Sequence, residues 1–248
     1  MGSTSVGVGI CRLCEGPTQP EFALCYCCTT LIGRLQMPLA PVTAVTPYRV
    51  GDGMHRLLRG YKDAPLAEVR SIHTSQLAGI LRWWLSEHGD RLLARTGGPW
   101  DLVVGVPSSQ RPMAPVDALV DALVDAVPSL ARQHLSLLVR GPEPTDHLVA
   151  SRRGFAVTSN GEAGCGERGR RALVVDDSFT TGARAQSAVA ALRIAGIRVA
   201  GVLVVGRVVA PDTAWWQAAY WDSMFEERRA ARAVEWAGEG HPVAGLPH

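Results

Sequence analysis

Lysine is almost absent from this chain. Lys62 is the only lysine among 25 basic residues, so any other cation at a binding or catalytic site must be an arginine or a protonated histidine. Charged residues make up only 19% of the 248 residues, and the formal net charge is +2. This balance gives no electrostatic case for binding bulk nucleic acid.

Long apolar runs are absent too. No stretch of 18 apolar residues occurs, so we expect no transmembrane helix and no membrane partner. Residues 1–10 have neither the basic region nor the apolar core of a signal peptide. We therefore expect a cytoplasmic protein with reduced thiols. A hydrophobic content of 47% suits one α/β domain with a small appendage.

Cysteine is scarce outside the N-terminal region, where five of the six lie close together. Cys11 and Cys14 form one C-x2-C pair, and Cys25 and Cys28 form a second after ten intervening residues. Two such pairs across a short loop suit a tetrahedral site closed by four thiolates, so we predict structural Zn²⁺. Cys27 is either a replacement ligand for one of its neighbours or a bystander. A disulfide cluster, the alternative, needs an oxidising compartment.

The most informative stretch is A-L-V-V-D-D-S-F-T-T-G-A-R, Ala172 to Arg184. It begins with an apolar run, continues with the adjacent acids Asp176 and Asp177, and ends in small and hydroxyl residues. Apolar residues then recur at helical spacing in an Ala-rich segment, and a second apolar run covers Val199 to Val209. This pattern predicts a buried strand, a loop, a helix and a further strand of a parallel sheet.

The expected chemistry follows from that geometry. Parallel sheets bind ligands in the crevice at the carboxyl ends of their strands. Thr180 to Arg184 lie where the loop becomes a helix, and the free N–H groups and positive dipole end there favour a phosphate. Gly182 permits close approach of the backbone. Because Asp176 and Asp177 can accept hydrogen bonds from two vicinal hydroxyls, the stretch describes a site for a ribose 5-phosphate.

The stretch resembles the phosphoribosyl diphosphate (PRPP) loop of type I phosphoribosyltransferases, in which a hydrophobic run precedes D-D-x-x-T-T-G-x-T. The resemblance implies that Asp176 and Asp177 contact ribose hydroxyls. It implies that the 5-phosphate is bound by Thr180, Thr181, Gly182, Ala183 and Arg184. Arg184 is a departure, since the family usually has Thr or Ser there. The backbone N–H of Arg184 can still donate to the phosphate, and its guanidinium either adds a phosphate contact or points to solvent.

Two other interpretations remain open. An acidic pair before a helix also resembles the start of a response-regulator receiver domain, whose acids bind a metal. A receiver needs a phosphoacceptor Asp after a later strand and a Lys beyond it, but only Asp212 follows nearby and Lys62 lies far upstream. A strand-like segment, Leu102 to Val106, also precedes the acids. The plainest alternative is a strand, turn and helix with capping residues and no ligand.

The order of segments along the chain resembles that of one branch of the phosphoribosyltransferase superfamily. A Pro-rich connector, Pro38 to Pro47, leads into a predicted strand pair, Val45 to Tyr61, around G-D-G, and a helix is predicted from Pro65 to Leu85. A cysteine knuckle, a hairpin ending in Y-K, a helix and a phosphoribosyltransferase core are similar to the ComF-type (competence-protein-like) branch of the superfamily.

This order predicts the division of the chain. We expect a zinc knuckle over 1–37, a connector and hairpin over 38–64, a type I phosphoribosyltransferase-like domain over 65–237 and a tail over 238–248. The fold class is α/β, with a parallel sheet of about five strands flanked by helices beside the small zinc-binding module.

Two further loops complete the expected site. After the predicted strand Trp100 to Pro107, the resemblance implies a pyrophosphate loop that includes Pro107, Ser108 and Ser109, although the R-G-F-N-Q segment usual in ComF-type chains is missing. Gly141 to Arg171 is rich in Gly, Arg, Pro and Ser, and the resemblance implies a mobile hood whose cations neutralise the diphosphate. The best candidates are Arg152 and Arg153, followed by Arg168, Arg170 and Arg171.

The predicted activity is transfer of phosphoribose from PRPP, with Mg²⁺, to an unidentified nitrogenous acceptor with release of diphosphate. Asp176, Asp177, Arg152 and Arg153 are then the catalytic residues. The alternative is a catalytically silent PRPP-binding protein with a regulatory or competence-related (DNA-uptake) role, for which nucleic acid is a possible partner. Aromatic residues on a predicted helix, Thr213 to Trp236, either cover the sheet, form a subunit contact such as a homodimer, or line the acceptor pocket.

Overall fold

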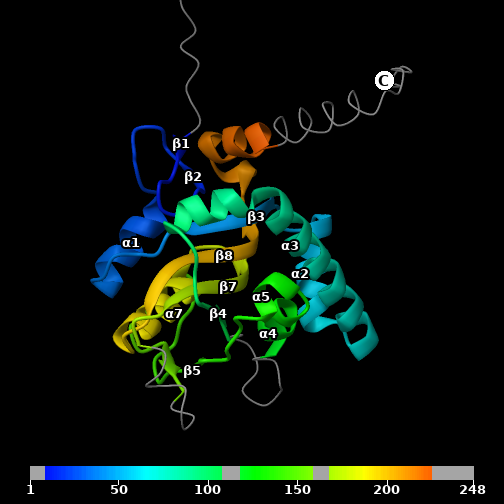
Figure 1. Cartoon of the computed structure of the whole chain (residues 1–248). Coiled ribbons are helices and arrows are strands. Elements are labelled where there is room, and N and C mark those ends of the chain that lie inside the picture. Colours follow the sequence, from blue (N-terminus) through cyan, green and yellow to red (C-terminus); the bar gives the residue numbers. More distant parts are fainter. Residues whose placement is uncertain (1–8, 108–117, 159–167, 225–248) are drawn as a thin grey trace, which may run out of the picture.

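The computed structural model describes residues 9–107, 118–158 and 168–224. Its centre is a parallel sheet in the order β3–β8–β7–β4 (Figure 1). The predicted α/β class is confirmed, with four strands in this sheet of the described chain rather than about five. The strands are β3 (Val42–Tyr48), β4 (Leu102–Gly105), β7 (Arg171–Phe179) and β8 (Arg198–Val208).

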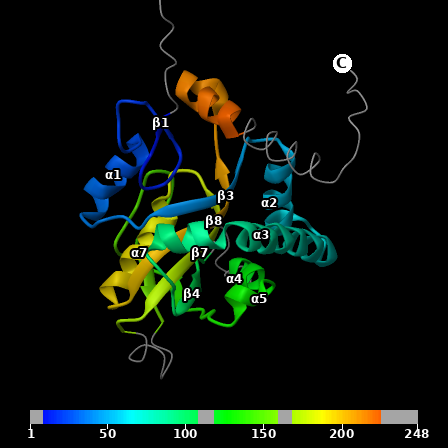
Figure 2. The same cartoon turned by 45° about the horizontal axis from the view of Figure 1, so that its top comes forward.

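Different helices cover the two faces of the sheet, as Figures 1 and 2 show. One apolar cluster joins the sheet to α1 (Tyr26–Leu35) and α7 (Ala183–Ile194). A second cluster lies on the other face. It joins the sheet to α2 (Gly53–Asp63), α3 (Ala67–Thr96), α4 (Ala118–Asp125) and α5 (Pro128–Ala131).

Strand β7 supplies side chains to both clusters because successive residues point to opposite faces. Ala172 and Val174 pack with α7, whereas Leu173 and Val175 pack with α3 and α4. All four are fully buried, and burying each Val or Leu side chain contributes about 1.5–3 kcal/mol. The uninterrupted apolar run is thus the pattern of a parallel strand covered on both faces.

The predicted hairpin over Val45 to Tyr61 is wrong. β3 is one strand, parallel to β8 at the edge of the main sheet, and α2 follows it. The G-D-G segment begins a helix instead of closing a hairpin: Asp52 Oδ1 accepts from the His55 N–H at 2.8 Å, as an N-cap does. Residues 38–64 therefore contribute a strand and a helix to the α/β core.

Helix α3 continues eleven residues past its predicted end at Leu85, to Thr96. The sequence S-E-H-G-D suggests a break, but Leu92 beyond it is almost fully buried and holds the helix against the core. The helix ends at Gly97, whose φ of 71° is left-handed, with the Gly98 N–H bonded to the Leu93 carbonyl at 2.8 Å.

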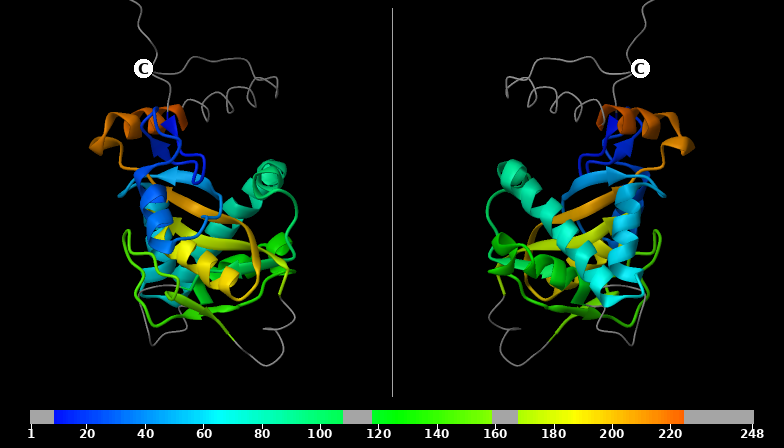
Figure 3. Two further views of the ribbon diagram at one scale, coloured as in Figure 1. Left: turned by 90° about the vertical axis from the view of Figure 1, so that its left-hand side faces the viewer. Right: turned by 90° about the vertical axis from the view of Figure 1, so that its right-hand side faces the viewer.

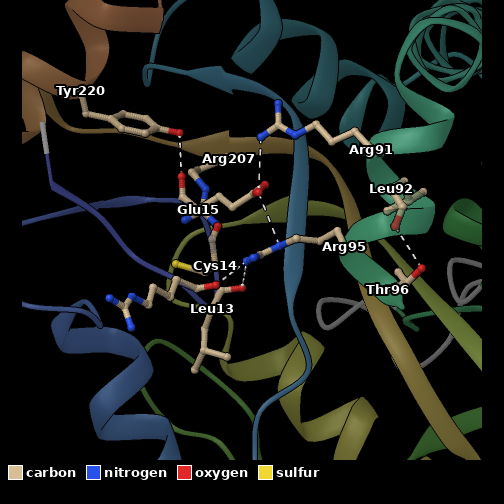
Figure 4. A network of polar contacts seen from close by, with 10 residues as sticks. Leu13, Cys14, Glu15, Arg91, Leu92, Arg95, Thr96, Arg207 and Tyr220 are labelled. Atoms are coloured by element: carbon tan, nitrogen blue, oxygen red, sulfur yellow. Dashed lines mark hydrogen bonds and ion pairs between the residues drawn. The ribbon is translucent and has the colours of Figure 1, made fainter. Parts of the chain in front are cut away.

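The cysteine-bearing segment packs on the core through a polar network around Glu15 (Figure 4). The Glu15 carboxylate lies 3.3 Å from Arg91 and 3.4 Å from Arg95, both on α3. Arg95 also donates to two backbone carbonyls of the segment, and the Tyr220 hydroxyl donates to the Glu15 carbonyl at 3.1 Å. Figure 3 shows this segment beside the helix over 215–224. The knuckle is therefore part of the folded body.

Small elements complete the fold. The knuckle holds an antiparallel pair, β1 (Gly9–Ile10) with β2 (Pro17–Thr18), and β5 (Leu138–Arg140) pairs with β6 (Phe155–Val157) away from the main sheet. The rest of the predicted C-terminal helix, from residue 225 onward, lies outside the described residues. In the described ranges no helix is both long and apolar enough to cross a membrane.

A buried histidine fastens α4 to the segment that follows α5. The two ring nitrogens of His134 lie 2.7 Å from Asp125 and 2.9 Å from Asp121, and Ser136 donates to Asp121 at 2.6 Å. Burial alone lowers the pKa of His134, but the hydrogen bonds to the two carboxylates outweigh it and raise the pKa above its ordinary value. The charged imidazolium can donate to both acids at once.

We expect this cluster to make stability depend on pH. Because the pKa of His134 is raised on folding, its contribution is fully present below the unfolded value of about 6.5 and is lost as the pH rises through the folded value. His134→Gln should cost about 2 kcal/mol of unfolding free energy at pH 6 and less at higher pH. Urea unfolding of both proteins from pH 6 to 9 checks this. A constant difference between them would contradict it.

Candidate functional site

The predicted ligand stretch folds as strand, loop and helix, but the strand is longer than expected. β7 continues through Asp176 and Asp177 to Phe179, and α7 begins at Ala183. Since neighbouring residues in a strand point to opposite faces of the sheet, the Asp176 and Asp177 carboxylates lie on different faces. Each carboxylate therefore contacts different residues.

Asp176 faces a small cavity of about 200 Å³ at the carboxyl end of β7. Only 2% of the residue is exposed, and its Oδ1 accepts from the Asp177 N–H at 3.0 Å. The cavity is lined by Asp176, by residues 178–185 of the loop and early helix, and by Thr145, Asp146 and His147 from a separate segment. The last three residues lie in the predicted hood, Gly141 to Arg171, but none of them was predicted as a site residue.

Asp177 faces α2 on the other side of the sheet. Its Oδ2 lies 2.5 Å from Lys62 Nζ and accepts a hydrogen bond from the fully buried Tyr61 hydroxyl. Its Oδ1 accepts from Ser178 at 2.8 Å. Both carboxylate oxygens are thus engaged by the protein itself. No role was predicted for Lys62, although it is the only lysine in the chain and this could have marked it as a functional residue.

The site balances two buried acids against two cations. Burial raises the pKa of Asp176, and Arg184 and Lys62 oppose that rise. Burial likewise raises the pKa of Asp177, and Arg184 opposes it. Burial lowers the pKa of Lys62 to about 8. Because Arg184 and Lys62 stand beside the acids, the negative charge is compensated inside the protein.

The loop after β7 leads into the start of α7 with a backbone geometry that favours an anion. Gly182 has a φ of 84° and caps α7, and a Cβ there would lie 2.5 Å from the Phe179 ring, so only glycine fits. Helix N-terminal N–H groups lack partners within their own helix and attract anions. The Thr180 side chain is exposed, whereas Thr181 Oγ1 accepts from the Leu148 N–H at 3.3 Å.

Arg184 connects this loop to the end of β4. Its Nη2 donates to the Pro107 carbonyl at 2.7 Å, so the guanidinium lies between two strand ends rather than in solvent. Its Nε is buried and has no hydrogen-bond partner among the described residues. Ser108 and Ser109, the other predicted pyrophosphate contacts, lie outside the described residues.

The segment Gly141 to Gly154 folds over the start of α7. The Ser151 N–H donates to Ser187 Oγ at 2.9 Å. Thr145 is only 7% exposed, and its hydroxyl, on the cavity wall, has no hydrogen-bond partner among the described residues. The segment therefore covers the loop after β7 and places the Thr145 hydroxyl on the cavity wall beneath it.

The predicted arginines do not line this cavity. Arg152 and Arg153 are exposed, and Arg153 lies 3.6 Å from Glu143, so their role at a diphosphate stays a prediction. Near the amino end of β7, the Arg170 guanidinium donates to the Asp101 carbonyl, and the Arg171 guanidinium donates to the Thr96 and Gly97 carbonyls. The nine residues of β7 span roughly 26 Å, which places these two arginines far from the phosphate loop, contrary to expectation.

The four predicted zinc ligands converge. The sulfurs of Cys11, Cys14, Cys25 and Cys28 all lie within 4.8 Å of one another. The Cys14 and Cys25 sulfurs are 3.7 Å apart, close to the edge of roughly 3.8 Å expected for a tetrahedron with Zn–S bonds of about 2.3 Å. Cys27 is not one of the four. The donor set and its spacing fit zinc.

The chain is distantly similar in structure to solved phosphoribosyltransferases. An adenine phosphoribosyltransferase from Leishmania tarentolae is 11% identical to this chain in sequence, with a TM-score of 0.34. The alignment covers 68% of this chain and 94% of that protein. A phosphoribosyltransferase from Corynebacterium diphtheriae is 20% identical, with a TM-score of 0.32, over 61% of this chain and 82% of that protein. No family model matches the chain, and no curated protein does. Likenesses this weak carry no argument about activity.

We expect the metal centre to tolerate loss of Cys27 but not of Cys28. Purified protein should contain about one zinc per chain. Cys27→Ser should keep that content because its sulfur is outside the cluster, whereas Cys28→Ser should lose most of it. Metal analysis by mass spectrometry after dialysis compares the two. Equal zinc content in both variants would contradict the assigned ligands.

We expect the contact between Lys62 and Asp177 to support the whole site. Lys62→Met leaves a buried carboxylate without its cation and should cost about 3–5 kcal/mol of unfolding free energy. Adding Asp177→Asn should restore part of the loss because the charge is gone while the hydrogen bond from Tyr61 can persist. Urea unfolding of the two single variants and the double variant measures the coupling. Strictly additive effects would argue against the ion pair.

Proposed function

We propose that the protein binds PRPP and transfers its phosphoribosyl group to a nitrogenous acceptor, releasing diphosphate. One observation carries the proposal: the D-D-S-F-T-T-G-A-R stretch forms a strand end, a glycine-capped loop and a helix start around a cavity that contains Asp176. A helix N-terminus favours the 5-phosphate, and the adjacent carboxylate suits a sugar hydroxyl.

The chain's own residues would act by binding and orientation. The N–H groups at the start of α7 hold the phosphate, and Asp176 accepts from a ribose hydroxyl. Arg184, which reaches the Pro107 carbonyl, places positive charge between the sugar site and the loop after β4. The cover formed by Gly141 to Gly154 excludes water and so limits hydrolysis. Positioning and electrostatics carry such a reaction without a protein nucleophile.

Magnesium fits the cavity as a partner of PRPP. Asp176 and Asp146 both line the cavity, and carboxylate oxygens are ligands that Mg²⁺ prefers. When bound, the ion would neutralise charge on the diphosphate oxygens.

Structural zinc in the knuckle also fits the charge around it. Arg207 is only 3% exposed and donates to the Cys14 carbonyl. Among the described residues no carboxylate forms an ion pair with Arg207. A zinc ion with four thiolates carries a net charge of about −2, so it would supply the missing counter-charge for this buried arginine.

A silent PRPP-binding protein, regulatory or competence-related, is the second candidate, and one observation favours it. Asp177 is held by Tyr61 and Lys62 on the far face of the sheet, so only Asp176 of the acidic pair reaches the cavity. Four further expectations from the sequence belong to the proposal. They are membership of the ComF-type branch, a cytoplasmic location, a homodimer and, for the silent binder, a nucleic-acid partner.

Asp176→Asn should weaken PRPP binding roughly tenfold or more, because a charged acceptor for a ribose hydroxyl is lost. Calorimetry with Mg²⁺ and PRPP measures this. Asp212→Asn is the matched control, since Asp212 is 82% exposed in its side chain and does not line the cavity. Equal affinities in folded wild type and Asp176→Asn would refute the site. Diphosphate release with a panel of bases then separates a transferase from a silent binder.

A further inference from the structure

A second and larger cavity lies between the knuckle and the α/β core. Its volume is about 650 Å³, within the range of roughly 300–1,000 Å³ typical of small-molecule sites. The knuckle provides one wall, including Phe22 and Tyr26, and the helix over 215–224 provides another, including Trp216. The floor is the carboxyl end of the sheet, where β7 and β8 end side by side.

This cavity adjoins the phosphate loop. Phe179 and Thr180 line both it and the smaller cavity that contains Asp176. A ligand in the larger cavity therefore lies next to the expected position of the ribose, separated by only two residues of chain. A transferase needs this adjacency, because the acceptor nitrogen must meet the sugar carbon that loses diphosphate.

The walls suit a flat aromatic ring. Phe22 and Tyr26 are 56% and 74% exposed, so their rings are open to contact by a ligand in the cavity. Aromatic faces bind planar bases by stacking, regardless of the base. Tyr26 directly follows the metal-ligand Cys25, so a bound metal would fix the position of this wall.

The same cavity contains a buried hydrogen-bond donor. Arg207 lines it, and the Arg207 Nε is buried with no hydrogen-bond partner among the described residues. The guanidinium carbon lies 4.4 Å from the centre of the Phe179 ring, which holds it in place. An unpartnered buried N–H costs free energy, and an oxygen on a ligand would satisfy it.

We propose that the cavity between knuckle and core is the acceptor site, and that it binds a planar nitrogen heterocycle with an exocyclic oxygen. The inference rests on the proposed function. The heterocycle stacks on Tyr26, beside the walls formed by Phe22 and Trp216, and its oxygen accepts from Arg207. The zinc knuckle thereby forms part of the substrate site as well as of the fold.

A pair of matched ligands tests this assignment on the full-length protein. Hypoxanthine carries an exocyclic oxygen and an N1–H where adenine carries an amino group and an unprotonated N1, so the two differ along the edge that meets Arg207. Calorimetry with ribose 5-phosphate and Mg²⁺ present, a mixture that cannot turn over, should show hypoxanthine binding roughly tenfold more tightly than adenine. Tyr26→Ala should weaken hypoxanthine binding roughly tenfold through lost stacking. Trp83→Ala, at an exposed aromatic on α3 outside the cavity, is the control and should bind as wild type does.

The outcomes separate this inference from the proposed function. PRPP binding together with the predicted base preference and the Tyr26→Ala loss supports both. PRPP binding with no base bound, with adenine preferred, or with no effect of Tyr26→Ala overturns the acceptor site and leaves the PRPP site standing. Hypoxanthine binding that depends on Tyr26 in a protein that does not bind PRPP supports the cavity and overturns the proposed transferase. Binding of neither ligand overturns both.

Discussion

The contact of Asp177 with Lys62 and Tyr61 is the interaction on which the candidate site depends. A carboxylate with 1% of its residue exposed is costly unless it is paired and hydrogen-bonded. Residues of α2 supply both partners. With Asp177 held on that face, the alternation of β7 turns Asp176 toward the opposite face, where the loop before α7 begins. The acid pair thus connects the helical layer on one side to the small cavity on the other.

The end of β7 joins three parts of the molecule. Gly182 brings α7 against Phe179, and Phe179 packs under the guanidinium of Arg207. Arg207 in turn reaches the backbone of Cys14 in the knuckle. On the other side, Arg184 reaches Pro107 at the end of β4. The cysteine cluster, the phosphate loop and the neighbouring strand end are therefore held by a short series of contacts within the fold.

Much of this arrangement could be predicted from the sequence because it depends on local pattern. The apolar run before Asp176, the glycine at 182 and the spacing of the cysteines each specify local backbone geometry, and the structure confirms the strand, the helix start and the convergence of four sulfurs. The hairpin prediction failed because G-D-G serves both turns and helix caps, and only pairing of β3 with β8 decides between them. Local pattern does not encode distant pairing.

The contacts missed from the sequence are all between distant segments. Lys62 meets Asp177 across 115 residues of chain. Thr145 reaches the cavity from the predicted hood, but no motif there singled out that residue. The sequence prediction also placed Asp176 and Asp177 at the same ligand. In the structure the two side chains point to opposite faces of the sheet, as neighbouring residues of a strand do.

The most direct test of the account is to locate a bound sugar phosphate by crystallography of the protein with ribose 5-phosphate. The account predicts the phosphate at the start of α7, contacted by backbone N–H groups beside Gly182, and a ribose hydroxyl on Asp176. A sugar phosphate bound elsewhere, or a phosphate loop left without ligand at saturating concentration, would contradict it.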